Sequence, residues 1–65
     1  MDSEKPFQTL TVDGYAQGFA NFDNAERHAR AIVRHLRPIE IWQGGNIIAL
    51  VFADRLKRTR MKMYG

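Results

Sequence analysis

The sequence predicts an α+β fold, in which one antiparallel sheet of three or four strands carries a single helix on one face. Three features indicate it: a helical segment that begins at Asp23, and two glycine turns, Asp13-Gly14 and Gly44-Gly45, each set between runs with high β-propensity. The helix lies between the two hairpins in the chain, so we expect the element order ββαββ, with βαββ as the fallback.

The first 20 residues predict a lead and a hairpin. We expect residues 1–6 to be disordered and the strand to begin after Pro6, since proline suits a strand entrance. The hairpin joins residues 7–12 (FQTLTV) to residues 15–20 (YAQGFA), and a tight Asp13-Gly14 turn places Val12 opposite Tyr15. The alternative is one long strand, bent at Asp13-Gly14.

The helix is predicted from about Asn24 to Leu36. Asp23 is a suitable N-cap, and Glu26 three residues later completes a capping box. The helix should stop before Pro38, because the residue that precedes proline is pushed out of the α region. Small and aliphatic residues at helical spacing predict the core stripe of this helix: Ala25, Ala29, Ile32, Val33 and Leu36.

The second hairpin, IEIWQ-GG-NIIALVFA, has two apolar faces. A two-residue Gly44-Gly45 loop predicts the pairs Trp42 with Ile47, Ile41 with Ile48, and Ile39 with Leu50. Only one helix is predicted to cover a face, so the other face is either filled by loops and tail or is an oligomer contact. For the oligomer contact we predict three residues: Trp42, Ile47 and Val51.

Length and composition limit the class of protein. A chain of 65 residues is one domain with a marginal core, and without cysteine it has no disulfide or thiolate metal site. Self-association is the remaining way to stabilise it, so we expect a homo-oligomer. No window is long and apolar enough to span a membrane and no signal peptide is visible, so we expect a soluble, cytoplasmic protein.

The basic residues are concentrated toward the end of the chain. From residue 53 onward there are five Lys and Arg residues against one acid, Asp54, whereas residues 1–52 hold five bases and six acids. We therefore divide the chain into the α+β domain at residues 7–54 and a basic tail at residues 55–65, whose order the sequence does not determine. As a strand, this tail would place Lys57, Thr59, Met61 and Met63 on one side.

Catalytic chemistry has little support in these residues. The sole serine, Ser3, lies in the expected lead, and His28 and His35 are two helical turns apart, about 10 Å along the axis, too far to share one metal ion. We predict a protein that is not an enzyme and has no metal or cofactor.

Two functions from different classes fit the sequence. The first is nucleic-acid binding through an arginine face of the helix and the basic tail, and the alternative is a protein-interaction or structural module whose apolar sheet face meets itself or a partner. An acidic protein is a further candidate partner. The predicted nucleic-acid contacts are Arg27, Arg30, Arg34, Arg37, Arg55, Lys57, Arg58, Arg60 and Lys62.

Overall fold

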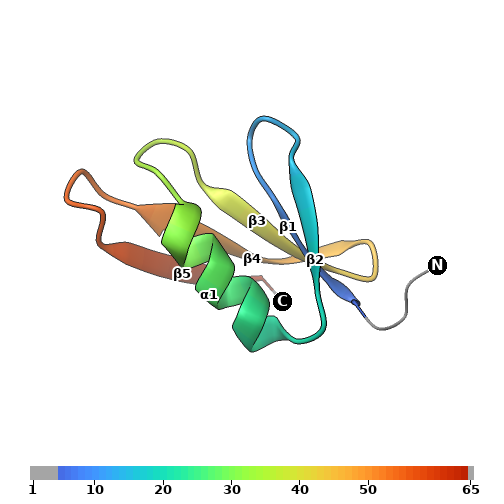
Figure 1. The fold of residues 1–65 in the computed structure, drawn as a ribbon. Coiled ribbons are helices and arrows are strands. Elements are labelled where there is room, and N and C mark those ends of the chain that lie inside the picture. The colour runs from blue at the N-terminus through green and yellow to red at the C-terminus, as the bar shows by residue number, and fades with distance from the viewer. Residues whose placement is uncertain (1–4, 65) are drawn as a thin grey trace.

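A computed structural model describes residues 5–64 as one five-stranded antiparallel sheet with a helix lying across one face (Figure 1). The strand order is β2-β1-β3-β4-β5, so α1 runs from the edge strand β2 back to the centre of the sheet. The predicted α+β class is confirmed, with one strand more than expected. In chain order the elements are β1 (Phe7–Leu10), β2 (Ala16–Phe19), α1 (Phe22–Ile32), β3 (Ile39–Gln43), β4 (Asn46–Ala53) and β5 (Thr59–Met63).

The first hairpin exists, with a longer loop than predicted. Leu10 pairs with Ala16, and Thr11 to Tyr15 form the loop, in which the Thr11 N–H donates to the Tyr15 carbonyl at 3.0 Å. The Thr11 hydroxyl accepts a second bond from the Tyr15 N–H at 3.1 Å. These bonds explain why the predicted pairing of Val12 with Tyr15 was wrong by one residue. The single bent strand was also wrong. Residues 1–4 of the predicted lead lie outside the described residues.

The helix begins two residues earlier than predicted. Asn21, not Asp23, is the N-cap, and its Oδ1 accepts the Asn24 N–H at 2.9 Å. Phe22 in the first turn packs against Phe7 of β1 in an edge-to-face contact, with ring centroids 6.0 Å apart. This contact ties the start of the helix to the sheet, and Asn21 is as good a cap as Asp23.

The helix also ends four residues before Leu36. Val33 is the C-cap with extended backbone, its side chain is buried, and Leu36 adopts a φ of +65° in the turn that follows. The chain must reverse here to enter β3 below the helix, and the turn closes where the Arg37 N–H donates to the Arg34 carbonyl at 3.0 Å. Arg34, His35 and Arg37 therefore lie outside the helix.

A bulge changes the register of the second hairpin. Trp42 pairs with Ile47 as predicted, but Ile41 pairs with Ala49 and Ile39 with Val51, because the register shifts by one residue between Ile41 and Trp42. A bulge places two residues of one strand opposite one residue of the other. The predicted pairs of Ile41 with Ile48 and of Ile39 with Leu50 were therefore wrong.

The shifted register determines which side chains of β4 lie on each face of the sheet. Side chains that face each other across an antiparallel pair share a face. The helix-covered face holds the core, which consists of Ala25, Ala29, Val33, Ile39, Ile41, Ala49 and Val51, with Thr9 also buried.

The opposite surface of the sheet is here called the open face. Within residues 5–64 no helix lies over it (Figure 1). Register and alternation assign it these side chains: Gln8, Leu10, Glu40, Trp42, Ile47, Leu50, Phe52, Arg60 and Lys62.

The basic tail contains the fifth strand. Val51 pairs with Met61 and Ala53 with Thr59, and the Tyr64 N–H extends the pairing to the Ile48 carbonyl at 2.9 Å. Thr59, Met61 and Met63 share one side, as the sequence predicts for a strand, and Met61 packs against the core. The sheet therefore extends past the predicted domain limit at residue 54.

Candidate nucleic-acid interface

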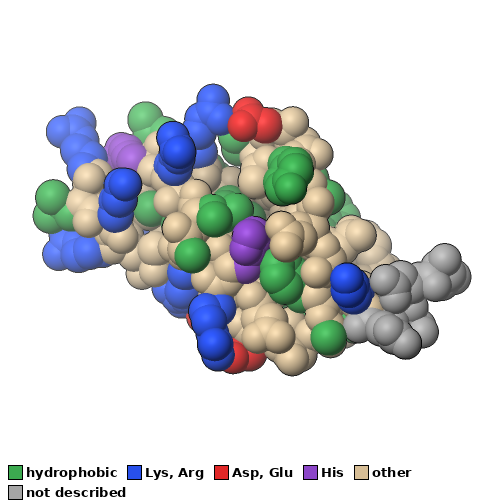
Figure 2. Space-filling view, viewed as in Figure 1, with side chains coloured by type: hydrophobic (Ala, Val, Ile, Leu, Met, Phe, Trp, Pro, Cys, Tyr) green, Lys and Arg blue, Asp and Glu red, His purple; other side chains and the backbone are tan. Residues whose placement is uncertain are grey.

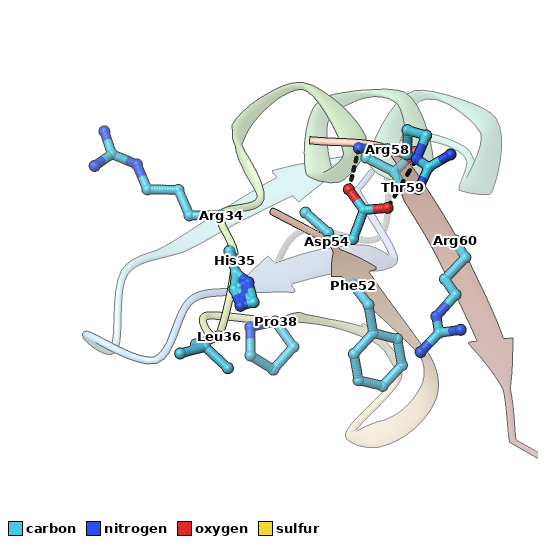
Figure 3. Close-up of a pocket in the computed structure, with 10 residues that line it drawn as sticks. Arg34, His35, Leu36, Pro38, Phe52, Asp54, Arg58, Thr59 and Arg60 are labelled. Carbon is cyan, nitrogen blue, oxygen red and sulfur yellow. Dashed lines mark hydrogen bonds and ion pairs between the residues drawn. The ribbon is translucent and has the colours of Figure 1, made fainter. Parts of the chain in front are cut away.

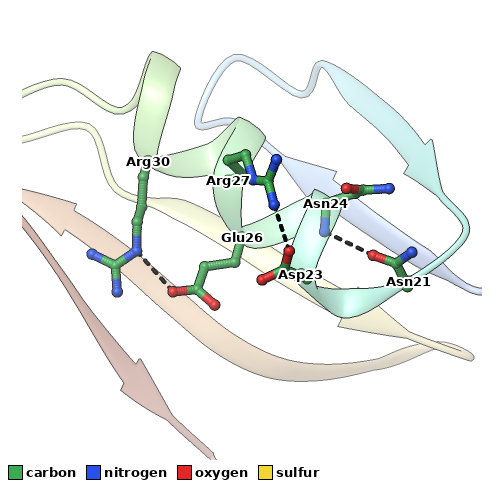
Figure 4. A network of polar contacts seen from close by, with 6 residues as sticks. All are labelled: Asn21, Asp23, Asn24, Glu26, Arg27 and Arg30. Carbon is green, nitrogen blue, oxygen red and sulfur yellow. Dashed lines mark hydrogen bonds and ion pairs between the residues drawn. The ribbon is translucent and has the colours of Figure 1, made fainter.

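The arginines of the helix are engaged by acids of the same helix (Figure 4). Arg27 contacts Asp23 at 2.7 Å, and Arg30 contacts Glu26 at 2.8 Å, each one helical turn away. Arg30 also donates to the Thr59 hydroxyl of β5 at 2.8 Å. The predicted arginine face is thus reduced to two residues, and both have a carboxylate partner.

Arg34 and Arg37 flank the turn between α1 and β3. Arg37 contacts Asp13 of the first hairpin loop at 3.0 Å, across 24 residues of sequence. Arg34 is exposed and takes part in none of the ion pairs found within residues 5–64. Of the four arginines predicted to share a helix face, Arg34 is the one that has no acid paired with it among residues 5–64.

Asp54 organises the turn between β4 and β5. Its Oδ1 accepts the N–H groups of Leu56 at 2.8 Å and Arg58 at 3.0 Å, and its Oδ2 meets the Arg58 guanidinium at 2.9 Å. These bonds, the Arg58 N–H first, hold the pKa of Asp54 below its usual value. The turn therefore holds Arg55 and Lys57 on the surface, both exposed and outside every ion pair of the described part of the chain.

The two turns lie at the same end of the sheet (Figure 1), and residues from both line one hollow (Figure 3). An open hollow of about 580 Å³ lies between them, lined by Arg34 and His35 on one side and by Arg58 and Arg60 on the other. A neighbouring hollow is lined by Arg34 together with Lys57. We call Arg34, Arg55 and Lys57 the basic end.

The space-filling view agrees with this separation of paired and unpaired charge. Blue side chains gather at the left end in Figure 2, where the α1–β3 and β4–β5 turns lie in Figure 1. At the upper and lower edges of the same view, blue groups have red carboxylates beside them. The basic end is thus the part of this face where positive charge is least compensated.

Arg60 and Lys62 lie on the open face, one after the other along β5. The Arg60 guanidinium carbon lies 5.7 Å from the centre of the Phe52 ring, and the Lys62 Nζ lies 5.6 Å from the centre of the Tyr64 ring. Contacts of this kind at exposed sites are weak, about 0.5–1 kcal/mol. Both cations remain exposed to solvent.

The predicted oligomer contact is divided between the two faces. Trp42 and Ile47 are half-buried on the open face, and the Trp42 indole N–H donates to Glu40 at 2.9 Å. Val51 is fully buried beneath α1, so its assignment to this surface was wrong. The bulge is the cause, and it brings Leu50 and Phe52 to the open face in place of Val51.

Two exposed leucines lie at the tips of the same turns. Leu36 is 85% exposed and Leu56 is 73% exposed, and Leu36 and Lys57 have positive φ angles of 65° and 63°. The core stripe predicted for the helix included Leu36, and no sequence pattern identified Leu56. The signal available for Leu36 was its position two residues before Pro38, where a helix does not readily persist.

The two histidines lie in different elements, because His35 is outside the helix in which the sequence predicts it. His28 lies against Phe19 with ring centroids 5.0 Å apart, whereas His35 lies in the α1–β3 turn. Within residues 5–64 no three His, Cys, Asp or Glu side chains form a group that could hold a metal ion. The described residues also contain no helix with the length and apolar character needed to cross a membrane.

Comparison with known proteins gave no relative for this chain. No protein-family model matches it, and neither a curated protein nor a solved structure does.

Proposed function

We propose that this protein is a binding module, not an enzyme, and that the basic end contacts the phosphate backbone of nucleic acid. One observation carries the proposal: Arg34 comes from one turn, Arg55 and Lys57 from another, and the fold brings them to one end without an acidic partner among the described residues. Cations that are not already paired release counterions from nucleic acid most effectively.

The neighbouring arginines extend this surface. Arg58 lies beside the basic end but shares its charge with Asp54, and Arg60 lies across the same hollow. Arg37 contributes less because it is paired with Asp13, and Arg27, paired with Asp23 on α1, lies outside this surface. The proposed contact surface therefore consists of two turns and the start of β5, in place of the helix face that the sequence suggested.

The test is fluorescence anisotropy with a labelled mixed-sequence DNA duplex at several salt concentrations. Each cation that neutralises a phosphate contributes about 0.9 to the slope of log K against log salt. We expect the Arg34→Gln, Arg55→Gln and Lys57→Gln variants each to weaken binding and to reduce the slope by about one.

The matched control is Arg27→Gln, which removes the same charge from a helix position paired with Asp23. We expect this variant to bind the duplex as the native protein does. An equal loss of binding in Arg27→Gln would show that net charge alone matters, and absence of binding at low salt would contradict the proposal.

Anionic lipid vesicles serve as the second probe, because exposed Leu36 and Leu56 lie beside these cations. Apolar side chains next to basic ones are also typical of proteins that bind the membrane surface. Binding to phosphatidylserine vesicles without binding to the duplex would replace nucleic acid by lipid as the partner. Retention of duplex binding in Leu36→Ser would support the proposal, because phosphate contacts do not need this side chain.

A further inference from the structure

The open face has a distribution of charge that is complementary to itself. Glu40 on β3, Leu50 on β4 and Lys62 on β5 lie in one row across the sheet, since Glu40 pairs with Leu50 and Leu50 pairs with Lys62. The acid and the base are therefore about 10 Å apart, two strand spacings, with the leucine midway between them.

We propose that two copies of this chain pack through their open faces, with a two-fold axis that lies between the two sheets and runs along β4. Such an axis exchanges β3 of one copy with β5 of the other and keeps each row in place. It therefore places Glu40 of each copy opposite Lys62 of the other, which gives two ion pairs. Between them, Leu50 of one copy contacts Leu50 of the other.

The same axis also aligns the apolar side chains of the other rows. Phe52 follows Leu50 on this face of β4, so it meets Phe52 of the second copy. Trp42 on β3 lies in the row that ends near Tyr64, because Trp42 pairs with Ile47 and the Tyr64 N–H bonds to Ile48. Trp42 of one copy therefore lies over the end of β5 in the other, and aromatic residues are typical of the centres of protein interfaces.

Other axes parallel to the strands give poorer contacts. An axis along β3 would set Glu40 against its own copy, and an axis along β5 would do the same for Lys62. An axis midway between β3 and β4 would set Glu40 against Leu50 and leave the carboxylate, buried by the contact, without a cation. Burying the Glu40 carboxylate without a partner is costly, so the positions of Glu40 and Lys62 favour the axis along β4.

Pairing through the β5 edge of the sheet is disfavoured by the same charges. An antiparallel contact between two β5 edges would bring Arg60 and Lys62 close to the same residues of the second copy, and basic residues on an edge strand are a common means of preventing such pairing. The open face, with its half-buried apolar residues and charges of both signs, is the better contact.

A rotation about β4 would also bring the two basic ends together. Because the axis runs parallel to the strand, both β4–β5 turns lie at the same end of the dimer. The dimer is inferred from the open face alone, so it does not depend on nucleic-acid binding, although it would present two basic ends to one duplex.

The test is a charge reversal followed by sedimentation-equilibrium measurements. Glu40→Lys brings two bases together at each ion-pair position, and Lys62→Glu brings two acids together. We expect each variant to raise the dimer dissociation constant by at least about a hundredfold, since like charges in an interface cost several kcal/mol.

Mixing the two variants provides the decisive measurement. In a mixed dimer, the lysine introduced at position 40 of the first variant faces the glutamate introduced at position 62 of the second. The native Lys62 of the first variant faces the native Glu40 of the second, so both ion pairs are attractive. We expect an equimolar mixture to form dimers at concentrations where each variant alone is a monomer. Continued failure of the mixture to associate, although circular dichroism shows both variants folded, would overturn the proposed axis.

The matched control is Arg27→Glu, which changes the net charge as Lys62→Glu does but on α1, on the side of the sheet opposite the open face. It should leave the dissociation constant unchanged. The proposal is overturned if the native protein is a monomer at several hundred micromolar, if the reversals leave the dimer intact, or if Arg27→Glu dissociates it equally. If the native protein dimerises but does not bind the duplex, the proposed function is contradicted and the proposed dimer is not.

Discussion

The helix-covered face and the open face are both rich in apolar residues, yet they differ in how completely these are buried. Beneath α1, Ile41 and Val51 are fully buried, whereas Trp42 and Leu50 on the open face remain half-buried. Composition therefore does not distinguish the two faces. The difference lies in what packs against each face: α1 covers the first, and within residues 5–64 no helix covers the second.

The covered face achieves its burial with small residues. Ala25 and Ala29 of the helix belong to the same core cluster as Ala49 of β4, and all three are fully buried. Small side chains let the helix approach the sheet closely, while Ile39, Ile41 and Val51 supply the volume. A helix with only 11 residues can cover the middle of the sheet in this way, but it leaves the opposite face untouched.

The largest expected effect is truncation on the covered face. Ile41→Ala should lower the free energy of unfolding by about 2–5 kcal/mol, because it leaves a cavity in a packed core. Leu50→Ala on the open face should cost less in the monomer, about 1 kcal/mol, because its side chain is already partly solvated. Urea denaturation at low protein concentration checks both, and equal losses would contradict the distinction between the faces.

Enlarging a buried alanine should have the next largest effect. Ala29→Leu forces extra volume between α1 and the sheet, and we expect a loss of about 1–3 kcal/mol. The control is Ala31→Leu, the same change at an exposed position of the same helix, which should be close to neutral. Thermal unfolding of the two variants measures how closely the helix contacts the sheet, and similar melting temperatures would refute the close packing.

Removal of the helix cap should cost less again. Asn21→Ala leaves the Asn24 N–H without its side-chain acceptor, and we expect a loss of about 1 kcal/mol. Asp23→Ala, at the residue that the sequence suggested as the cap, should cost only a few tenths of a kcal/mol, because its ion pair with Arg27 is exposed. Chemical denaturation measures both losses. A larger loss of unfolding free energy in Asp23→Ala than in Asn21→Ala would identify Asp23 as the cap.

The smallest effect concerns the β4–β5 turn, which is stabilised by hydrogen bonds and not by burial. The pKa of Asp54 is lowered on folding, so its stabilising contribution is complete above the ordinary value of 3.8 and is lost as pH falls through the lowered value. We expect the protection factors of the Leu56 and Arg58 amides, measured relative to their intrinsic exchange rates at each pH, to fall in this acidic range while Ile41 stays protected. Asp54→Asn should remove this pH dependence, and persistence of the dependence would identify another group as its source.

The unpaired cations show why the candidate site could not be read from the sequence. Helical periodicity groups Arg27, Arg30, Arg34 and Arg37 on one face, but the helix ends at Ile32 and acids from the helix and from the loop at Asp13 neutralise three of them. Spacing gives the positions of charges along an element. Their neutralisation depends on which carboxylates the fold brings near.

The amino-acid sequence by itself determined the α+β class, the single helix between two hairpins, and the glycine turn at Gly44-Gly45. Strong local signals carry these features, namely propensity, capping side chains and turn residues. Tertiary structure decided the helix limits, the bulge at Ile41 and Trp42, and the fifth strand. The first two depend on contacts between residues distant in the chain, Phe22 with Phe7 at the helix start and the packing of Val51 beneath α1, and the third depends on the pairing of β5 with the preceding strand β4.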